Sequence, residues 1–272
     1  MRTKSNNISK EITILIKLVF FLCIAALMPI LSGCDISTST SSASTSQVST
    51  LQLTNSTTTS DIDYDINIMD DRSGSGLDIV KPDTSFYLQI VRHFSSLGSA
   101  CISAIVVGNP AVDNRSFIRL YLNKPFQVPD NAILSEQARY RKRNADILIN
   151  NSNKTEKWIK LIDQKIIHYC PNKNLDLTLL QEPIDKTYRL LSEPTFSKSK
   201  KILIIISDLI NEPTRPGKIE SFNNKFDEIE GLKLISVGAK NPNIFIKVKD
   251  YQNFESIDGV IHYLITINNN NF

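Results

Sequence analysis

Carboxylate and hydroxyl side chains alternate near residue 70 in a spacing that can surround a metal ion. Asp71, Ser73 and Ser75 occupy alternate positions, and Gly74 lies between the two serines. A tight turn that presents a carboxylate and two hydroxyls in this way directs three hard oxygen atoms toward one point, and such ligands suit Mg²⁺, Mn²⁺ or Ca²⁺. Asp, Ser and Gly are also the usual residues of a plain surface turn, so the spacing alone leaves both interpretations open.

A second carboxylate follows a segment that is expected to be a buried strand. After Lys201, residues 202–206 form an unbroken β-branched and aliphatic run, and Asp208 is the first acidic residue after it. A continuous apolar run fits a strand that is buried on both faces of a parallel sheet. Ligand sites of such sheets lie beyond the carboxyl ends of the strands, so we expect Asp71 and Asp208 to converge there.

The elements that position these residues alternate between strands and helices. The patterns predict strands at residues 64–70, 101–107, 116–122, 201–206, 232–237 and 244–248. Helices are predicted at residues 83–98, 134–167, 184–191, 219–229 and 256–265. This alternation predicts an α/β fold with a doubly wound, mainly parallel sheet, one antiparallel edge strand at residues 116–122, and helices on both faces.

The order of these parts resembles that of a von Willebrand factor type A domain, the fold shared with integrin inserted domains. The likeness covers residues 62–267, nearly all of the chain beyond its first 61 residues. Residues 231–238, which read Gly-Leu-Lys-Leu-Ile-Ser-Val-Gly, look like the fifth strand of that family and the glycine that follows it.

Three segments match the metal-ion-dependent adhesion site of that family. They are the Asp71 to Ser75 turn after the first strand, Thr178 in the loop before the third helix, and Asp208 after the fourth strand. The resemblance implies that Ser73, Ser75 and Thr178 contact a divalent cation directly or through water. It also implies that Asp71 and Asp208 complete the shell, with Mg²⁺ as the first expectation and Mn²⁺ or Ca²⁺ as alternatives.

The chemistry of such a site favours protein binding over catalysis. Two carboxylates and several neutral hydroxyls leave residual positive charge on a divalent ion, and an acidic side chain of a partner protein can replace an exchangeable water. A metal-dependent hydrolase of the phosphoester class is the alternative, and it would need a further acid or base, for which Glu212 is the nearby candidate. A third reading is a metal-free scaffold with the same fold. We expect a protein that is not an enzyme.

The amino-terminal segment predicts export and attachment to a membrane. Basic residues precede the apolar residues 18–31, and this order is typical of an export signal. The apolar stretch runs into Leu-Ser-Gly-Cys34, which resembles the lipobox of bacterial lipoproteins and implies cleavage before Cys34 and a lipid on that cysteine. An uncleaved signal anchor is the alternative. Either reading places the bulk of the chain at the cell membrane, facing the periplasm or the exterior; Asp35 resembles an inner-membrane retention signal only if the host has two membranes.

Composition divides the chain into four parts. Residues 1–33 are the expected signal peptide, 34–61 a Ser/Thr-rich disordered tether that begins with Cys34, 62–267 the folded domain, and 268–272 a frayed tail. The chain has 31 Lys and Arg and 28 Asp and Glu, and removal of the four basic and one acidic residues of the signal leaves 27 of each. This balance argues against a nucleic-acid-binding surface.

Two further groups of residues have alternative readings. Arg139, Arg141, Lys142 and Arg143 form a basic cluster on the long polar helix, where neighbouring acidic residues favour a solvated face over contact with anionic lipid headgroups. Cys101 and Cys170 are the two cysteines left in the domain, and the predicted topology places them toward opposite ends of the sheet. We therefore expect no disulfide between them.

Overall fold

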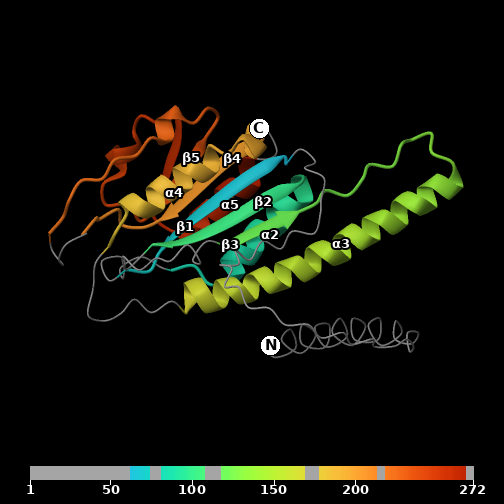
Figure 1. The fold of residues 1–272 in the computed structure, drawn as a ribbon, viewed down its shortest axis with the longest axis horizontal. Helices are drawn as coiled ribbons and strands as arrows, with labels where there is room; N and C mark the ends of the chain where they lie inside the picture. Colours follow the sequence, from blue (N-terminus) through green and yellow to red (C-terminus); the bar gives the residue numbers. More distant parts are fainter. Residues whose placement is uncertain (1–61, 74–80, 108–117, 169–177, 213–217, 268–272) are drawn as a thin grey trace, which may run out of the picture. The chain divides into compact units, whose positions relative to one another are not determined.

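The computed structural model describes residues 62–73, 81–107, 118–168, 178–212 and 218–267, and their strands form one six-stranded sheet (Figure 1). The strands are β1 (Tyr64–Asp71), β2 (Ala100–Val107), β3 (Ile118–Leu122), β4 (Lys200–Ile206), β5 (Lys233–Val237) and β6 (Asp250–Phe254). The helices are α2 (Thr84–Leu97), α3 (Leu134–Ile162), α4 (Gln181–Leu191) and α5 (Ile257–Ile267). Shorter helical turns are η3 (Asp163–Ile167), η4 (Pro194–Phe196), η5 (Phe226–Glu228) and η6 (Pro242–Phe245).

The sheet has the order β3-β2-β1-β4-β5-β6, and β3 alone runs antiparallel to its neighbour. The predicted doubly wound, mainly parallel sheet with one antiparallel edge strand is therefore confirmed. The chain moves from β1 toward one edge and then returns to place β4 on the other side of β1, so the strand order reverses between β1 and β4. Open α/β sheets bind their ligands at such a reversal, beyond the carboxyl ends of the strands.

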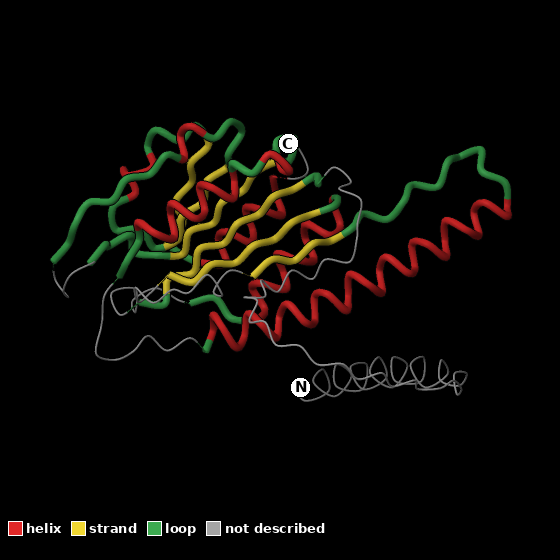
Figure 2. Tube along the Cα trace, viewed as in Figure 1, coloured by secondary structure: helices red, strands yellow, loops and turns green. Residues whose placement is uncertain are grey.

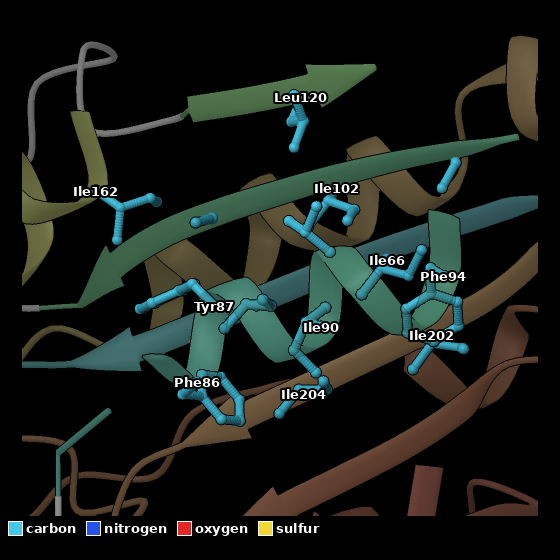
Figure 3. Close-up of a cluster of buried hydrophobic side chains, with 14 of the residues drawn as sticks. Ile66, Phe86, Tyr87, Ile90, Phe94, Ile102, Leu120, Ile162, Ile202 and Ile204 are labelled. Carbon is cyan, nitrogen blue, oxygen red and sulfur yellow. The ribbon is translucent and has the colours of Figure 1, made fainter. Parts of the chain in front are cut away.

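Helices cover both faces of the sheet. On one face α2, α5 and the carboxyl-terminal part of α3 pack on the sheet, and Figure 3 shows Phe86, Ile90 and Phe94 of α2 lying over isoleucines of the strands. On the other face α4 packs with η5 and η6 over Leu203 and Ile205 of β4. Every residue of β1 and β2 is buried, so both faces of these two strands are covered.

Local signals fix the two ends of α2. The side chain of Asp83 accepts hydrogen bonds from the backbone N–H groups of Ser85 at 2.9 Å and Phe86 at 3.1 Å, so it caps the helix as predicted. At the other end, a Cβ on Gly98 would lie 2.5 Å from Oδ2 of Asp63. A side chain here would have to displace the Asp63 carboxylate, which accepts a hydrogen bond from the N–H of Ser99 at 2.8 Å, so glycine suits the position where the helix ends.

Two predicted elements near the carboxyl terminus are wrong. Residues 218–225 form a loop, not the first part of a helix over 219–229, and only Phe226–Glu228 makes a short helical turn. The side chain of Asn224 donates to the carbonyl of Ile244, and the backbone N–H of Asn223 donates to the side chain of Gln181; such bonds compete with a helix. The predicted strand at 244–248 is also wrong, because Pro242–Phe245 is helical and the strand begins at Asp250.

The amino-terminal half of α3 extends past the edge of the sheet beside an extended segment, residues 123–131 (Figure 2). None of the α3 residues from 134 to 150 is buried. Two asparagines hold the extended segment instead of an apolar core: the amide of Asn144 bonds both main-chain groups of Phe126, and the amide of Asn151 bonds both of Asn123. The basic cluster of Arg139, Arg141, Lys142 and Arg143 lies on this half of α3 and is exposed.

Several sequence predictions concern residues outside the described ranges. The signal peptide, the whole tether with Cys34, Ser75 and the tail belong to this group, as does Cys170. Cys101 is a free, buried thiol, and burial raises its pKa to about 12. Among the described helices, none combines the length and the apolar composition needed to cross a membrane.

A buried carboxylate lies on the face of β1 that does not contact α2. Asp65 is 2% exposed and accepts a hydrogen bond from the Asn67 amide at 3.1 Å through Oδ1, whereas its Oδ2 has no hydrogen-bond partner. Burial raises the pKa of Asp65 from 3.8 to about 7, against the opposing effects of Asn67, Arg119 and Lys201. Between about pH 4 and pH 7, the folded state therefore holds a proton here that the unfolded chain has released.

We predict that Asp65→Asn removes a pH dependence of stability between about pH 4 and pH 7. A native pKa above the unfolded value means that stability is present in full below pH 3.8 and is lost as the pH rises through about 7. The loss is of order 4 kcal/mol at about 1.4 kcal/mol for each pH unit. Urea unfolding of wild type and variant at pH 4 and pH 8 measures it, with exposed Asp130→Asn as the control.

If the free-energy difference between Asp65→Asn and wild type stayed constant over this range, the buried carboxylate would not be protonated in the folded protein.

Candidate metal centre

Asp71 is the last residue of β1, and its carboxylate is fixed from two sides. Oδ1 accepts hydrogen bonds from the backbone N–H of Ser73 at 2.9 Å and from its hydroxyl at 2.5 Å. Oδ2 accepts a hydrogen bond at 2.6 Å from the hydroxyl of Ser207, the residue directly after β4. The side chain therefore ties the ends of two neighbouring strands together. Burial raises the pKa of Asp71, and the hydrogen bonds from Ser207 and Ser73 oppose that rise.

Asp208 follows Ser207 and is 1% exposed. Its Oδ1 accepts a hydrogen bond from the backbone N–H of Ile210 at 3.0 Å, which closes a small turn, and its Oδ2 lies 3.5 Å from Nζ of Lys240. Leu209, between Asp208 and Ile210, has a φ of 60°, a left-handed conformation that costs a residue with a Cβ about 1 to 2 kcal/mol. The Leu209 side chain is buried in the apolar cluster under α4, and this burial offsets the cost.

Thr178 belongs to a loop that pairs with the Asp208 loop. The backbones of Thr178 and Glu212 exchange two hydrogen bonds, N–H to carbonyl, at 3.2 and 2.9 Å. The amide of Asn211 accepts from the N–H of Leu180 at 3.1 Å and so adds a second link between the same two loops. Thr178 is fully buried. The loop before α4 and the loop after β4 are therefore held side by side, as the metal-site prediction requires.

Asp70, the neighbour of Asp71, points to the opposite face of the sheet and has a structural role. Its Oδ2 accepts a hydrogen bond from the guanidinium of Arg72 at 2.6 Å and another from the hydroxyl of Tyr87 at 2.7 Å. The same Arg72 nitrogen also donates to the carbonyl of Pro82 at 2.7 Å. These contacts fix the first turn of α2 against the end of β1, and the positive charge of Arg72 is committed to Asp70.

Lys81 brings a positive charge to the end of β1. This half-buried residue precedes Pro82, and its ammonium group donates a hydrogen bond to the main-chain carbonyl of Asp71. Burial lowers the pKa of Lys81, while the charges of Asp71, Asp70 and Asp208 act to raise it. Both carboxylates that were predicted to bind metal therefore lie within electrostatic reach of one ammonium group.

The structure thus places four of the five predicted metal ligands at one end of the sheet. Asp71 is the last residue of β1, whereas Ser73, Thr178 and Asp208 lie on three neighbouring loops beyond the carboxyl ends of the strands, and all four are buried. Ser75 lies outside the described residues.

Sequence reasoning missed Ser207 and Lys81. The signal for Ser207 was its position at the end of an apolar run, directly before Asp208. Lys81 gave no comparable signal, because only the placement of α2 brings it to Asp71.

The residues at this site fit a hard divalent cation. All of the placed candidates offer carboxylate or hydroxyl oxygen, the ligand type that Mg²⁺, Mn²⁺ and Ca²⁺ prefer. The ammonium group of Lys81 bonds the main-chain carbonyl of Asp71, so one positive charge is already held beside these oxygens. Within the described ranges no group of three or more His, Cys, Asp or Glu side chains is placed to share a metal ion. Binding here would therefore depend on hydroxyl oxygens in addition to the two carboxylates.

Comparisons with known proteins give matches among solved structures alone. No protein-family model matches the chain, and no curated protein sequence matches it. Two similar structures are the pilus adhesin SpaC from Lactobacillus rhamnosus GG in its open conformation and the manganese-loaded TRAP protein of Plasmodium vivax. SpaC gives a TM-score of 0.39 at 12% identity over 75% of this chain, which spans 29% of SpaC. TRAP gives 0.36 at 11% identity, over 75% of this chain and 74% of TRAP.

We predict that Ser207→Ala destabilises the domain by about 1 to 3 kcal/mol, because the variant removes a hydrogen bond to buried Oδ2 of Asp71 and leaves the N–H of Leu209 without its 3.0 Å acceptor. Denaturant unfolding measures the loss. Ser192→Ala is the matched control, since this exposed serine bonds a main-chain carbonyl within α4 and its removal should change stability by less than about 0.5 kcal/mol. Equal losses in the two variants would contradict the proposed link between β1 and β4.

Proposed function

We propose that this domain is a cation-dependent protein-binding module of the cell envelope. The observation that carries the proposal is that three segments meet at the reversal of strand order: the end of β1, the loop before α4 and the loop after β4. Each contributes one buried oxygen-bearing side chain, namely Asp71, Thr178 and Asp208. A site that offers carboxylate and hydroxyl oxygens suits a divalent cation, with Mg²⁺ proposed first and Mn²⁺ or Ca²⁺ as alternatives.

The chain's own residues would prepare this site before a cation binds. Ser73 and Ser207 hold the Asp71 carboxylate in one orientation, and the turn at Ile210 does the same for Asp208. Such pre-organisation reduces the entropy that is lost on binding. When bound, a divalent ion with an open coordination position would accept a carboxylate oxygen from a partner protein. We therefore propose an acidic residue as the partner's contact point.

We further propose that the chain is attached to the cell membrane by a lipid on Cys34 and faces the periplasm or the exterior. The support is the Leu-Ser-Gly-Cys sequence after an apolar segment, followed by the Ser/Thr-rich stretch up to residue 61. A coil of about 25 residues has a root-mean-square reach of roughly 25 to 30 Å, enough to lift a domain clear of lipid headgroups. The binding site would then be presented to partners in the envelope.

The alternative of a phosphoester hydrolase receives no specific support from the described residues. Glu212, the candidate acid or base, lies in the site loop, where its main chain pairs with Thr178. No described cluster of acidic residues could hold a pair of metal ions in the manner of two-metal hydrolases. Protein binding is therefore the function that the geometry favours.

The proposal predicts that Asp71→Asn weakens Mn²⁺ binding by about tenfold or more, since loss of even an outer-shell partner typically costs 10- to 100-fold in metal affinity. Isothermal titration of the full-length chain with Mn²⁺ and with Mg²⁺ measures the effect. Asp65→Asn is the matched control, because it removes a buried carboxylate from the opposite end of the same strand and should leave affinity unchanged.

Asparagine keeps one acceptor oxygen for Ser73, and its NH2 group can donate to the hydroxyl oxygen of Ser207, so circular dichroism should show a folded variant. Equal affinities of wild type and Asp71→Asn would overturn the assignment of this site, and an absence of binding in wild type would favour the metal-free scaffold.

A further inference from the structure

The positive charges near the candidate metal centre are divided unequally among its carboxylates. Arg72 is committed to Asp70 on the far face of the sheet, with a contact of 2.6 Å. Lys240 lies 3.5 Å from Asp208, but its side chain is 52% exposed, so solvent screens the pair. Lys81 is the described basic residue that bonds Asp71 itself, through the main-chain carbonyl. Lys81 is therefore the basic residue whose charge acts on buried Asp71, in addition to the larger effects of the serine hydrogen bonds.

The backbone before α2 holds Lys81 in position. Asp83, two residues later, caps α2, and the carbonyl of Pro82 accepts a hydrogen bond from Arg72 at 2.7 Å. The main chain on the carboxyl side of Lys81 is thus anchored to both the helix and the end of β1. A long, flexible side chain on an anchored backbone can leave the site without a change in the fold.

We propose that Lys81 is a tethered counter-ion of the candidate metal centre, and that a divalent cation must displace its ammonium group to bind. This inference rests on the proposed cation site and adds a residue that sets its affinity. In the absence of a cation, the ammonium group compensates the field of Asp71 and Asp208, so the domain remains folded. When a cation binds, it would repel the ammonium group of Lys81, and the lysine side chain turns toward solvent.

Displacement has a consequence for selectivity and for the partner. A monovalent ion gains too little from the two carboxylates to replace an ammonium group that is already tethered, whereas a divalent ion gains more. The displaced ammonium group would remain next to the site because its backbone is anchored. It would then lie close to an acidic residue of a bound partner and favour that charge.

The test is Mn²⁺ titration of the full-length chain and of Lys81→Met at low ionic strength, by calorimetry and by electron paramagnetic resonance of free Mn²⁺. Methionine keeps most of the length and the apolar character of the lysine stem and removes its charge. We expect Lys81→Met to bind Mn²⁺ about tenfold more tightly than wild type, because the competing charge is gone. Lys81→Arg keeps the charge and should stay within about threefold of wild type.

Two further variants separate the possible outcomes. Lys240→Met removes an exposed basic group near Asp208 and should change affinity by less than about threefold. The double variant Lys81→Met with Asp71→Asn should lose the gain, which places the bound ion at the same site. Equal or weaker Mn²⁺ binding by Lys81→Met would overturn the counter-ion role of Lys81 and would leave the proposed cation site in place. If neither wild type nor Lys81→Met bound Mn²⁺, both the site and the counter-ion role would be rejected.

Thermal unfolding provides a readout that does not require a measured affinity. Without metal, Lys81→Met should unfold at a lower temperature than wild type, because the buried carboxylates have lost a compensating charge. Saturating Mn²⁺ should then raise its midpoint more than that of wild type. A variant that is equally stable without metal would show that the ammonium group compensates nothing.

Discussion

The parallel pairing of β1 with β4 is the constraint on which the rest of this structure depends. It places Asp70 opposite Ile206. Asp71, the last residue of β1, therefore lies next to Ser207, the residue directly after β4. Their side chains meet at 2.6 Å. The same pairing creates the reversal of strand order, because β2 and β3 lie on one side of β1 and β5 and β6 on the other. A register shifted by one residue would turn Asp71 toward α2 and dismantle the site.

Two consecutive carboxylates at the end of β1 have different tasks because side chains of a strand alternate between faces. Asp70 faces α2, where Arg72 and Tyr87 satisfy it and the contact fixes the start of that helix. Asp71 faces the loops after β4 and before α4, where serine hydroxyls hold it and Lys81 approaches its main chain. The arrangement of the first carboxylate is what positions Lys81 for the second, since Arg72 also bonds the carbonyl next to that lysine.

The sequence allowed prediction of the sheet and of the ends of its strands, because buried parallel strands leave long apolar runs. The position of Asp208 after such a run was sufficient to place it near Asp71. The sequence did not reveal which groups would hold these carboxylates. Strand register brings Ser207 to Asp71, and the packing of α2 brings Lys81 there. The helix predicted at residues 219–229 failed for a related reason. Its apolar spacing was helical, but side-chain to main-chain bonds at Asn224 and Gln181 favoured a loop.

The proposed site requires side chains from three separate segments to surround a single cation position. Anomalous diffraction at the manganese absorption edge, from crystals of the full-length chain grown with Mn²⁺, tests this requirement. We predict one anomalous peak among Asp71, Ser73, Thr178 and Asp208, with oxygen ligands at about 2.0 to 2.6 Å or one water away, and with the Lys81 ammonium group turned out of the site. A peak elsewhere on the domain, or none at saturating Mn²⁺, would contradict it.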